Sequence, residues 1–184
     1  MELNSLTHLT NNIPWQRLTT AYGRGTDIPQ LIQTGQYEEL ANLIEHQSTL
    51  WQTTPWVLLI LLQELSKQKP EQVSLQEIQL YMAVASAINV DEMDSQNAVE
   101  TMNELLDEKY LWPEDEEDDE LWWEEEEPRG YEQEAFFSYF SYSYLLLKDA
   151  IPVFTAIMEE NDKLAPAIQE LLLMLQSEGE RAVE

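Results

Sequence analysis

Carboxylates dominate the chemistry that this sequence offers. The stretch 113–127, PEDEEDDELWWEEEE, holds eleven acidic residues and no basic one. Such a density of negative charge attracts Lys and Arg side chains and speeds the encounter with a basic partner. Tryptophans lie within and beside the run, and Trp is enriched among the residues that dominate binding energy at protein interfaces. We predict that the following residues bind a partner: Trp112, Glu114, Asp115, Glu116, Glu117, Asp118, Asp119, Glu120, Trp122, Trp123, Glu124, Glu125, Glu126 and Glu127.

The acidic run also has two structural interpretations. Like charges repel at i,i+4 spacing, so the run is expected to form a loop or a weak helix. A charged segment of this kind often serves only as a solvated insertion that aids solubility. The tryptophans, for their part, can fold back and anchor the run on a helical core. The sequence leaves these alternatives open beside partner binding.

Overall charge excludes several classes of function. The 184 residues include 36 acidic and 9 basic ones, which gives a net charge of −27. Most of it lies in the second half: residues 1–90 carry −4 and residues 91–184 carry −23. Nucleic-acid binding requires clustered Lys and Arg, and anionic membranes repel such a chain. We therefore expect neither nucleic acid nor a membrane as a partner, and a basic protein instead.

Other features of the composition concern redox chemistry and location. The chain has no Cys, which excludes disulfides, zinc ribbons and thiol catalysis. The longest apolar run, 56–62, is much shorter than the roughly 20 residues that span a bilayer. The first residues lack the basic and apolar regions of a secretory signal. We expect a cytoplasmic protein.

Candidate catalytic and ligand-binding motifs are weak. The loop Gly23-Arg24-Gly25 precedes a helix but lacks the spacing and the lysine of a phosphate-binding loop, and a helix-ending turn explains it. His46 lies near Glu45 and Ser48, yet three neighbours in sequence do not make a catalytic triad. The acidic stretches 91–94 and 114–120 lack the turn glycine of an EF-hand calcium loop. We predict no catalytic residue, no metal site and no cofactor.

The elements that must position the acidic run are predicted to be helices, with no convincing strand. Ser74 and Glu77 form a capping-box pattern, in which each side chain satisfies a free backbone amide. Asp94 or Ser95 is expected to cap a helix that carries Val99, Met102 and Leu106. Apolar spacing and capping signals predict helices at about 15–22, 27–32, 37–44, 54–65, 74–88, 95–106, 136–147, from about 150, and 166–175.

An aromatic run, FFSYFSYSY, covers residues 136–144. Helical spacing places some of these rings on the core and others on a second face. We expect Tyr139 and Tyr142 to point toward another face of the helix. The rings expected on the core are Phe136, Phe137, Phe140 and Tyr144.

A weak internal repeat indicates the fold class. The pattern Asp-(x)-Ile-Pro, apolar helix, turn, apolar helix occurs at 27–44 and again at 149–175. Stacked helix pairs of this kind are typical of α-solenoids, and an irregular helical bundle gives a similar pattern. We predict an all-α, HEAT-like solenoid or an irregular helical bundle. Residues 1–184 would form one helical domain, with an acidic, Trp-rich insertion at about 110–130.

Residues 13–65 resemble a known family. The matching features are Trp15-x-x-Leu18, Ala21-Tyr22-Gly23, Asp27-Ile-Pro29 and His46-Gln47-Ser48, followed by the apolar helix from Pro55. They resemble the N-terminal part of bacterial HEAT-like repeat proteins, among which are immunity proteins of polymorphic toxin systems. Ser48 stands where members often have Gly. The resemblance implies an α-solenoid scaffold and no catalytic residues, and it does not cover the acidic insertion.

Charge and resemblance together predict a non-enzymatic immunity protein, or antitoxin. It would bind a cognate basic toxin domain and block its active site or its access to substrate. The alternative is an acidic secretion or assembly chaperone for a basic client protein. The two differ in the partner's state, because a chaperone holds an unfolded segment and an immunity protein binds a folded domain.

Overall fold

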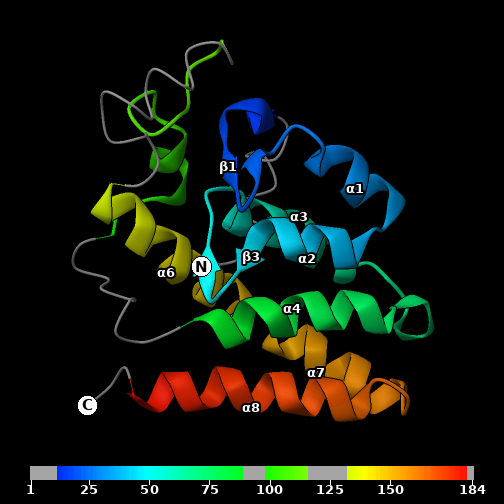
Figure 1. Ribbon diagram of the computed structural model, residues 1–184. Helices are drawn as coiled ribbons and strands as arrows, with labels where there is room; N and C mark the ends of the chain where they lie inside the picture. Colours follow the sequence, from blue (N-terminus) through cyan, green and yellow to red (C-terminus); the bar gives the residue numbers. More distant parts are fainter. Residues whose placement is uncertain (1–11, 89–97, 116–131, 182–184) are drawn as a thin grey trace.

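The computed structural model describes residues 12–88, 98–115 and 132–181, with the side chains of 177–181 left out (Figure 1). Within these residues the chain is mostly helical, which confirms the predicted helical class. The α-helices are α1 (Ile28–Thr34), α2 (Tyr37–Ile44), α3 (Thr53–Leu65), α4 (Leu75–Ala87), α6 (Gln133–Asp149), α7 (Ile151–Glu160) and α8 (Ala165–Arg181). The shorter elements are three 3₁₀ turns, η2 (Trp15–Arg17), η3 (Pro70–Gln72) and η5 (Met102–Leu106), and the strands β1 (Thr19–Thr20), β2 (Gly23–Arg24), β3 (Glu45–His46) and β4 (Thr49–Leu50).

The helices form stacked layers. Helices α2, α4 and α8 lie one below another in Figure 1, and α4 packs against both of the others. Helix α3 packs against α6, and α7 packs against α8. Segments far apart in sequence thus share one core, and the strands form two small antiparallel hairpins, of which β4 contributes Leu50 to that core.

Local signals explain where several helices begin and end. Helix α1 begins with Pro29 in its first turn and ends at Gly35, whose φ of 65° lies in the left-handed region that favours glycine. Helix α4 begins after Ser74, whose hydroxyl accepts a hydrogen bond from the Glu77 amide at 3.1 Å. The other half of the predicted capping box is absent. The buried Glu77 carboxylate accepts a hydrogen bond from the Tyr81 hydroxyl at 3.0 Å instead.

The prediction of a helix at about 15–22, and of no strands, is wrong. After the short turn η2 the chain forms the antiparallel hairpin β1–β2, in which Thr19 pairs with Arg24. A second hairpin, β3–β4, turns at Gln47 and Ser48, which have φ values of 52° and 60°. Strands of two residues are too short to show the alternating pattern by which strands are recognised.

Of the helix predicted at about 95–106, the structure describes residues 98–106. Within these residues only the 3₁₀ turn η5 forms, and Thr101 caps it: the Thr101 amide donates to the Glu104 carboxylate at 3.0 Å. The predicted caps Asp94 and Ser95 lie outside the described residues. Helix α7 begins after Ala150 and uses no side-chain cap, although Asp149 was the expected opening residue.

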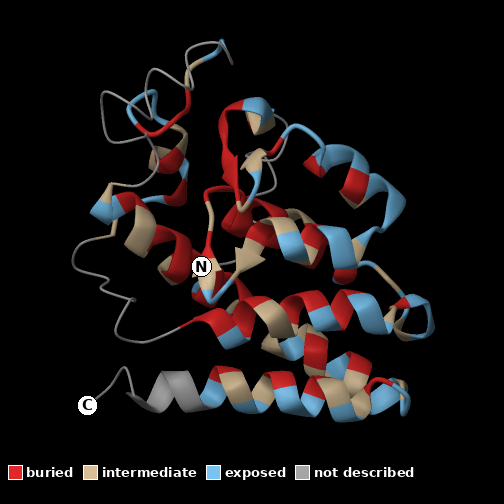
Figure 2. Cartoon of the chain, in the orientation of Figure 1, coloured by how far each residue is buried: buried red, intermediate tan, exposed pale blue. Residues whose placement is uncertain are grey.

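The core draws on every α-helix. Buried residues, red in Figure 2, lie where the helices face one another. Helix α3 is buried on nearly all sides, as its apolar sequence predicts. In the aromatic run of α6, Phe140 and Tyr144 are buried as predicted, whereas Phe136 and Phe137 are only partly buried. Tyr139 and Tyr142, expected on another face, are buried as well. The reason is that α6 is packed by α3, α4 and η5 as well as by α7 and α8.

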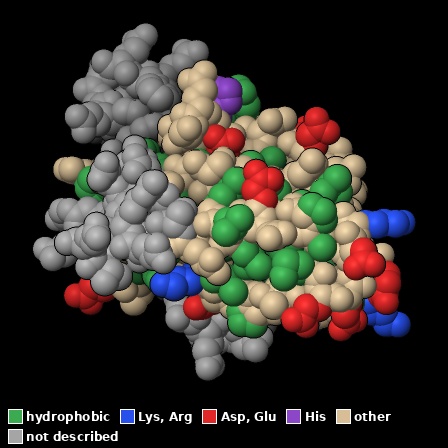
Figure 3. Space-filling model, turned by 90° about the horizontal axis from the view of Figure 1, so that it is seen from below, with side chains coloured by type: hydrophobic (Ala, Val, Ile, Leu, Met, Phe, Trp, Pro, Cys, Tyr) green, Lys and Arg blue, Asp and Glu red, His purple; other side chains and the backbone are tan. Residues whose placement is uncertain are grey.

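The α8 side of the molecule combines apolar and acidic residues. Figure 3 views this side, where hydrophobic side chains gather in the middle and most Asp and Glu side chains lie toward the edge. Leu173 of α8 is 59% exposed. Within the described residues, no helix has both the length and the apolar character needed to cross a membrane.

Candidate functional site

The acidic run enters the described structure at its first residues, and Trp112 lies just before it. Only 7% of Trp112 is exposed, and its backbone amide donates to the Arg17 carbonyl at 3.0 Å. The Arg24 guanidinium lies 5.5 Å from the centre of the indole ring, within cation–π range. Trp112 therefore follows the alternative in which a tryptophan anchors the run on the core. Its burial leaves little of the ring for a partner.

Arg17 fixes this end of the run. It is 8% exposed, and its Nε donates to the Trp112 carbonyl at 2.6 Å. Its two terminal nitrogens donate to both carboxylate oxygens of Glu108, a two-point geometry that a guanidinium fork favours. The Glu114 carboxylate oxygen Oε1 lies 3.9 Å from Nη1 of Arg17. The hydrogen bond to Glu108 raises the pKa of Arg17, which stays charged throughout the range in which proteins fold.

Arg24, which belongs to the hairpin β1–β2, holds the residues that follow Trp112. Its Nη1 donates to the carbonyls of Gln16 at 2.7 Å and of Pro113 at 2.9 Å, and its Nη2 to the Asp115 carbonyl at 3.5 Å. The hairpin is tied in turn to α3. A Cβ on Gly25 would lie 2.8 Å from a Thr53 side-chain carbon, so only glycine fits there. The Gly23–Gly25 segment thus forms a structural hairpin whose arginine faces the acidic run.

A buried amide supports the same segment from inside. Gln52 is 1% exposed, and its side chain accepts from the Thr19 amide at 2.8 Å and donates to the Tyr110 carbonyl at 2.6 Å. Gln52 therefore joins β1 to the residues that lead into the acidic run. Because each of these polar groups is buried, losing one partner would leave the other unsatisfied.

Described residues on the two sides of 116–131 also contact each other. Glu134, in the first turn of α6, accepts hydrogen bonds from the Tyr110 hydroxyl and, at 3.0 Å, from Lys109. The bond from Tyr110 and then that from Lys109 lower the pKa of Glu134. Residues on both sides of 116–131 are therefore held together at one end of the molecule, beside the hairpin β1–β2.

Most of the predicted binding residues lie outside the described residues. Of the predicted set, Trp112, Glu114 and Asp115 are described, and the side chain of Glu114 is 89% exposed. The remainder fall in the range that the structure does not describe: Glu116, Glu117, Asp118, Asp119, Glu120, Trp122, Trp123, Glu124, Glu125, Glu126 and Glu127. Their role stays a prediction.

The histidine motif lies in the hairpin β3–β4. The Tyr22 hydroxyl is 3.2 Å from Nδ1 of His46, and the two rings are 5.3 Å apart. Glu45 accepts from the Ser48 backbone amide at 3.0 Å, so its carboxylate stabilises the turn. These contacts give His46, Glu45 and Ser48 a structural role. Within the described ranges no three His, Asp or Glu side chains are grouped to hold a metal ion.

Sequence reasoning missed two features. The arginines that hold the run could not be paired from sequence, because Arg17 and Glu108 are 91 positions apart. The second feature is a polar groove between α2 and α4, with the buried Glu77 behind it. A Tyr four residues after Glu77 is a local signal of that buried pair, since such residues meet on one helix face.

Comparisons of the chain with protein-family models, with curated proteins and with solved structures found no match. The resemblance to HEAT-like immunity proteins therefore rests on the sequence features alone.

Proposed function

We propose that this protein is a non-enzymatic immunity protein that binds and blocks a basic toxin domain in the cytoplasm. The acidic run is its binding element, and a HEAT-like α-solenoid is its scaffold. The main support for the proposal is the acidic run itself, which has eleven acids in fifteen residues. Hydrogen bonds hold described residues on either side of the run at one end of the fold.

Charge gives the mechanism of encounter. A concentrated negative field steers a positively charged cleft toward the run and raises the association rate. Arg17 and Arg24 lie beside the start of the run and offset part of its charge, but the eleven acids of the run far outnumber them. Carboxylates 116–120 and 124–127 would then pair with Lys and Arg, while Trp122 and Trp123 anchor the complex.

Inhibition would follow by occlusion. An acidic segment seated in a basic cleft excludes the substrate, and it resembles nucleic acid in charge if the toxin is a nuclease. The same geometry blocks another basic enzyme, such as an ADP-ribosyltransferase, equally well. No group on this chain needs to react.

The test is a tagged pull-down from the source cell at low and high salt, with mass spectrometry of the eluate. A single basic protein that elutes at high salt, and whose gene kills cells that lack this protein, supports the proposal. Many unrelated, unfolded basic clients would contradict it and favour the chaperone alternative.

A further inference from the structure

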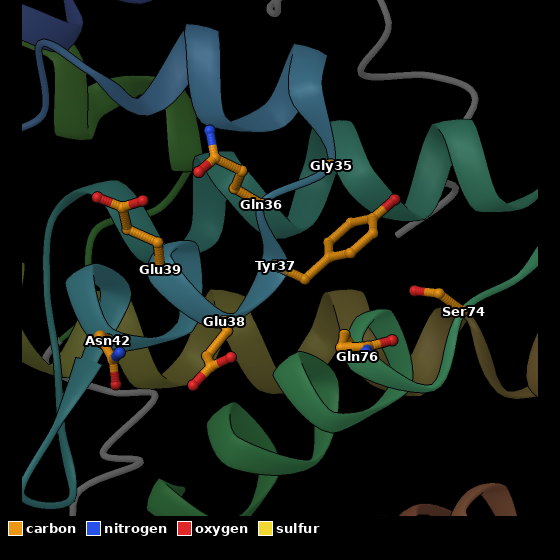
Figure 4. A pocket seen from close by; sticks show the side chains of 8 residues that line it. All are labelled: Gly35, Gln36, Tyr37, Glu38, Glu39, Asn42, Ser74 and Gln76. Carbon is orange, nitrogen blue, oxygen red and sulfur yellow. The ribbon is translucent and has the colours of Figure 1, made fainter.

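A polar groove lies between α2 and the first turn of α4, away from the hairpin that holds the acidic run. It consists of two hollows of about 620 and 340 Å³, which share the lining residues Tyr37, Glu38, Asn42 and Gln76. Figure 4 shows Tyr37 between the two helices, with Ser74 and Gln76 across from it and Glu38 and Asn42 further along α2.

The lining favours a ligand that is both cationic and rich in hydrogen-bonding groups. Side-chain amides line the groove along both helices: Gln36, Asn42, Gln76 and Gln79. Each amide offers donors and an acceptor, which match the N–H and C=O groups of an extended peptide backbone. Glu38 and Glu39 add two exposed carboxylates, and none of the residues that line either hollow is Lys or Arg.

A buried carboxylate fixes the aromatic wall of this groove. The Tyr37 hydroxyl is hydrogen-bonded to Glu77, which is 1% exposed and also accepts from Tyr81. Burial and the neighbouring Glu77 raise the pKa of Tyr37 to about 12, so the phenol stays neutral. A ring held in this way loses little conformational freedom when a ligand binds.

We propose that the groove between α2 and α4 binds an extended peptide segment that carries Lys or Arg. The amides bind its backbone, Glu38 and Glu39 bind its cationic side chains, and the Tyr37 ring packs against one of them. This inference does not rest on the acidic run or on the immunity function, because every residue it uses lies on α2, α4 and the turns that precede them.

The test must separate the groove from the attraction that a chain of charge −27 exerts on any cation. We would use the full chain with the nine acids of 116–127 changed to Asn or Gln. The probe is a fluorescein-labelled octapeptide of alternating Lys and Ser, measured by fluorescence anisotropy at 150 mM ionic strength. In this background, Glu38→Gln with Glu39→Gln is expected to weaken binding roughly tenfold, since two ion pairs of up to about 0.7 kcal/mol each are lost.

The matched control removes the same charge elsewhere. Glu159→Gln with Glu160→Gln, on α7, should change affinity less than about twofold. Asn42→Ala with Gln76→Ala keeps the charge and should weaken binding, and backbone amide shifts on peptide addition should cluster in α2 and α4. Equal losses for both Glu pairs, or shifts confined to other elements, would overturn the proposal. So would complete loss of binding once the acidic run is neutralised, an outcome that leaves the immunity proposal standing.

Discussion

At the scale of single residues, the structure relies on a few buried polar groups. Glu77 is a buried residue of α4, and its carboxylate is held by Tyr81 of the same helix and by Tyr37 of α2. Burial raises its pKa above the ordinary value of 4.5 despite these hydrogen bonds. The sequence indicated a capping role for Glu77 because the Ser-x-x-Glu pattern is local, whereas the partners of a buried carboxylate depend on packing.

Glu77 should make stability depend on pH. Its folded-state pKa is raised, so the stability that neutral Glu77 contributes is complete below pH 4.5 and is lost as pH rises through the raised pKa. Glu77→Gln stays neutral and keeps an acceptor for Tyr81. We expect urea denaturation between pH 5 and 8 to show the variant gaining stability over wild type as pH rises. Glu71→Gln, at an exposed position, is the control, and parallel curves for wild type and Glu77→Gln would contradict the assignment.

A second prediction concerns the turn of β3–β4. Ser48 has a φ of 60°, in the left-handed region that is unfavourable for residues with a Cβ. Its contact with Glu45 uses the backbone amide, so Ser48→Gly keeps that bond. We expect the change to stabilise the protein by about 0.5–1 kcal/mol. Ser86→Gly, inside α4, should destabilise it by a similar amount, and thermal melts showing the same sign for both would refute the strain at Ser48.

At the scale of elements, the long helices could be predicted from the sequence, but the hairpins and turns that connect them could not. Helices such as α3 and α6 carry many apolar residues at helical spacing, and their sequences predict them directly. Hairpin β1–β2 depends on contacts that no local pattern reveals, among them the bond from the Thr19 amide to the Gln52 side chain, 33 positions apart. The sequence predicts the candidate site as a charged segment. It does not predict the attachment through Arg17, because the residues that Arg17 binds are far from it in the sequence.

The Arg17 attachment gives a prediction at this scale. Lysine presents a single ammonium and cannot reproduce both the bond to the Trp112 carbonyl and the two-point contact with Glu108. Arg17→Lys should therefore lower the free energy of unfolding by about 1–3 kcal/mol, because a buried carbonyl loses its donor. Glu108→Gln should cost less than about 1 kcal/mol, since that side chain is 72% exposed. If chemical denaturation shows a similar loss of unfolding free energy for both variants, Arg17 acts only as a surface charge.

At the scale of the whole molecule, charge and shape divide the surface into distinct regions. The acidic run is attached at the end that carries β1–β2, the polar groove lies between α2 and α4, and the α8 side is apolar in its middle. Binding through the run alone fits a folded basic partner. Binding of an extended basic segment in the groove is a separate contact, which a folded partner with a basic tail can make as well as an unfolded client, so it does not decide between the immunity function and the chaperone alternative.

The central claim is that the acidic run speeds the capture of a basic partner. Its most direct test is the association rate of the partner identified by pull-down, measured by stopped flow across a range of salt concentrations. The comparison is between wild type, the chain with the nine acids of 116–127 neutralised, and the Glu159→Gln, Glu160→Gln control. Neutralising the run should slow association at low salt by on the order of tenfold or more and flatten its salt dependence, while the control behaves as wild type. Equal rates and equal salt dependence for all three, with the fold intact, would show that the run only keeps the protein in solution.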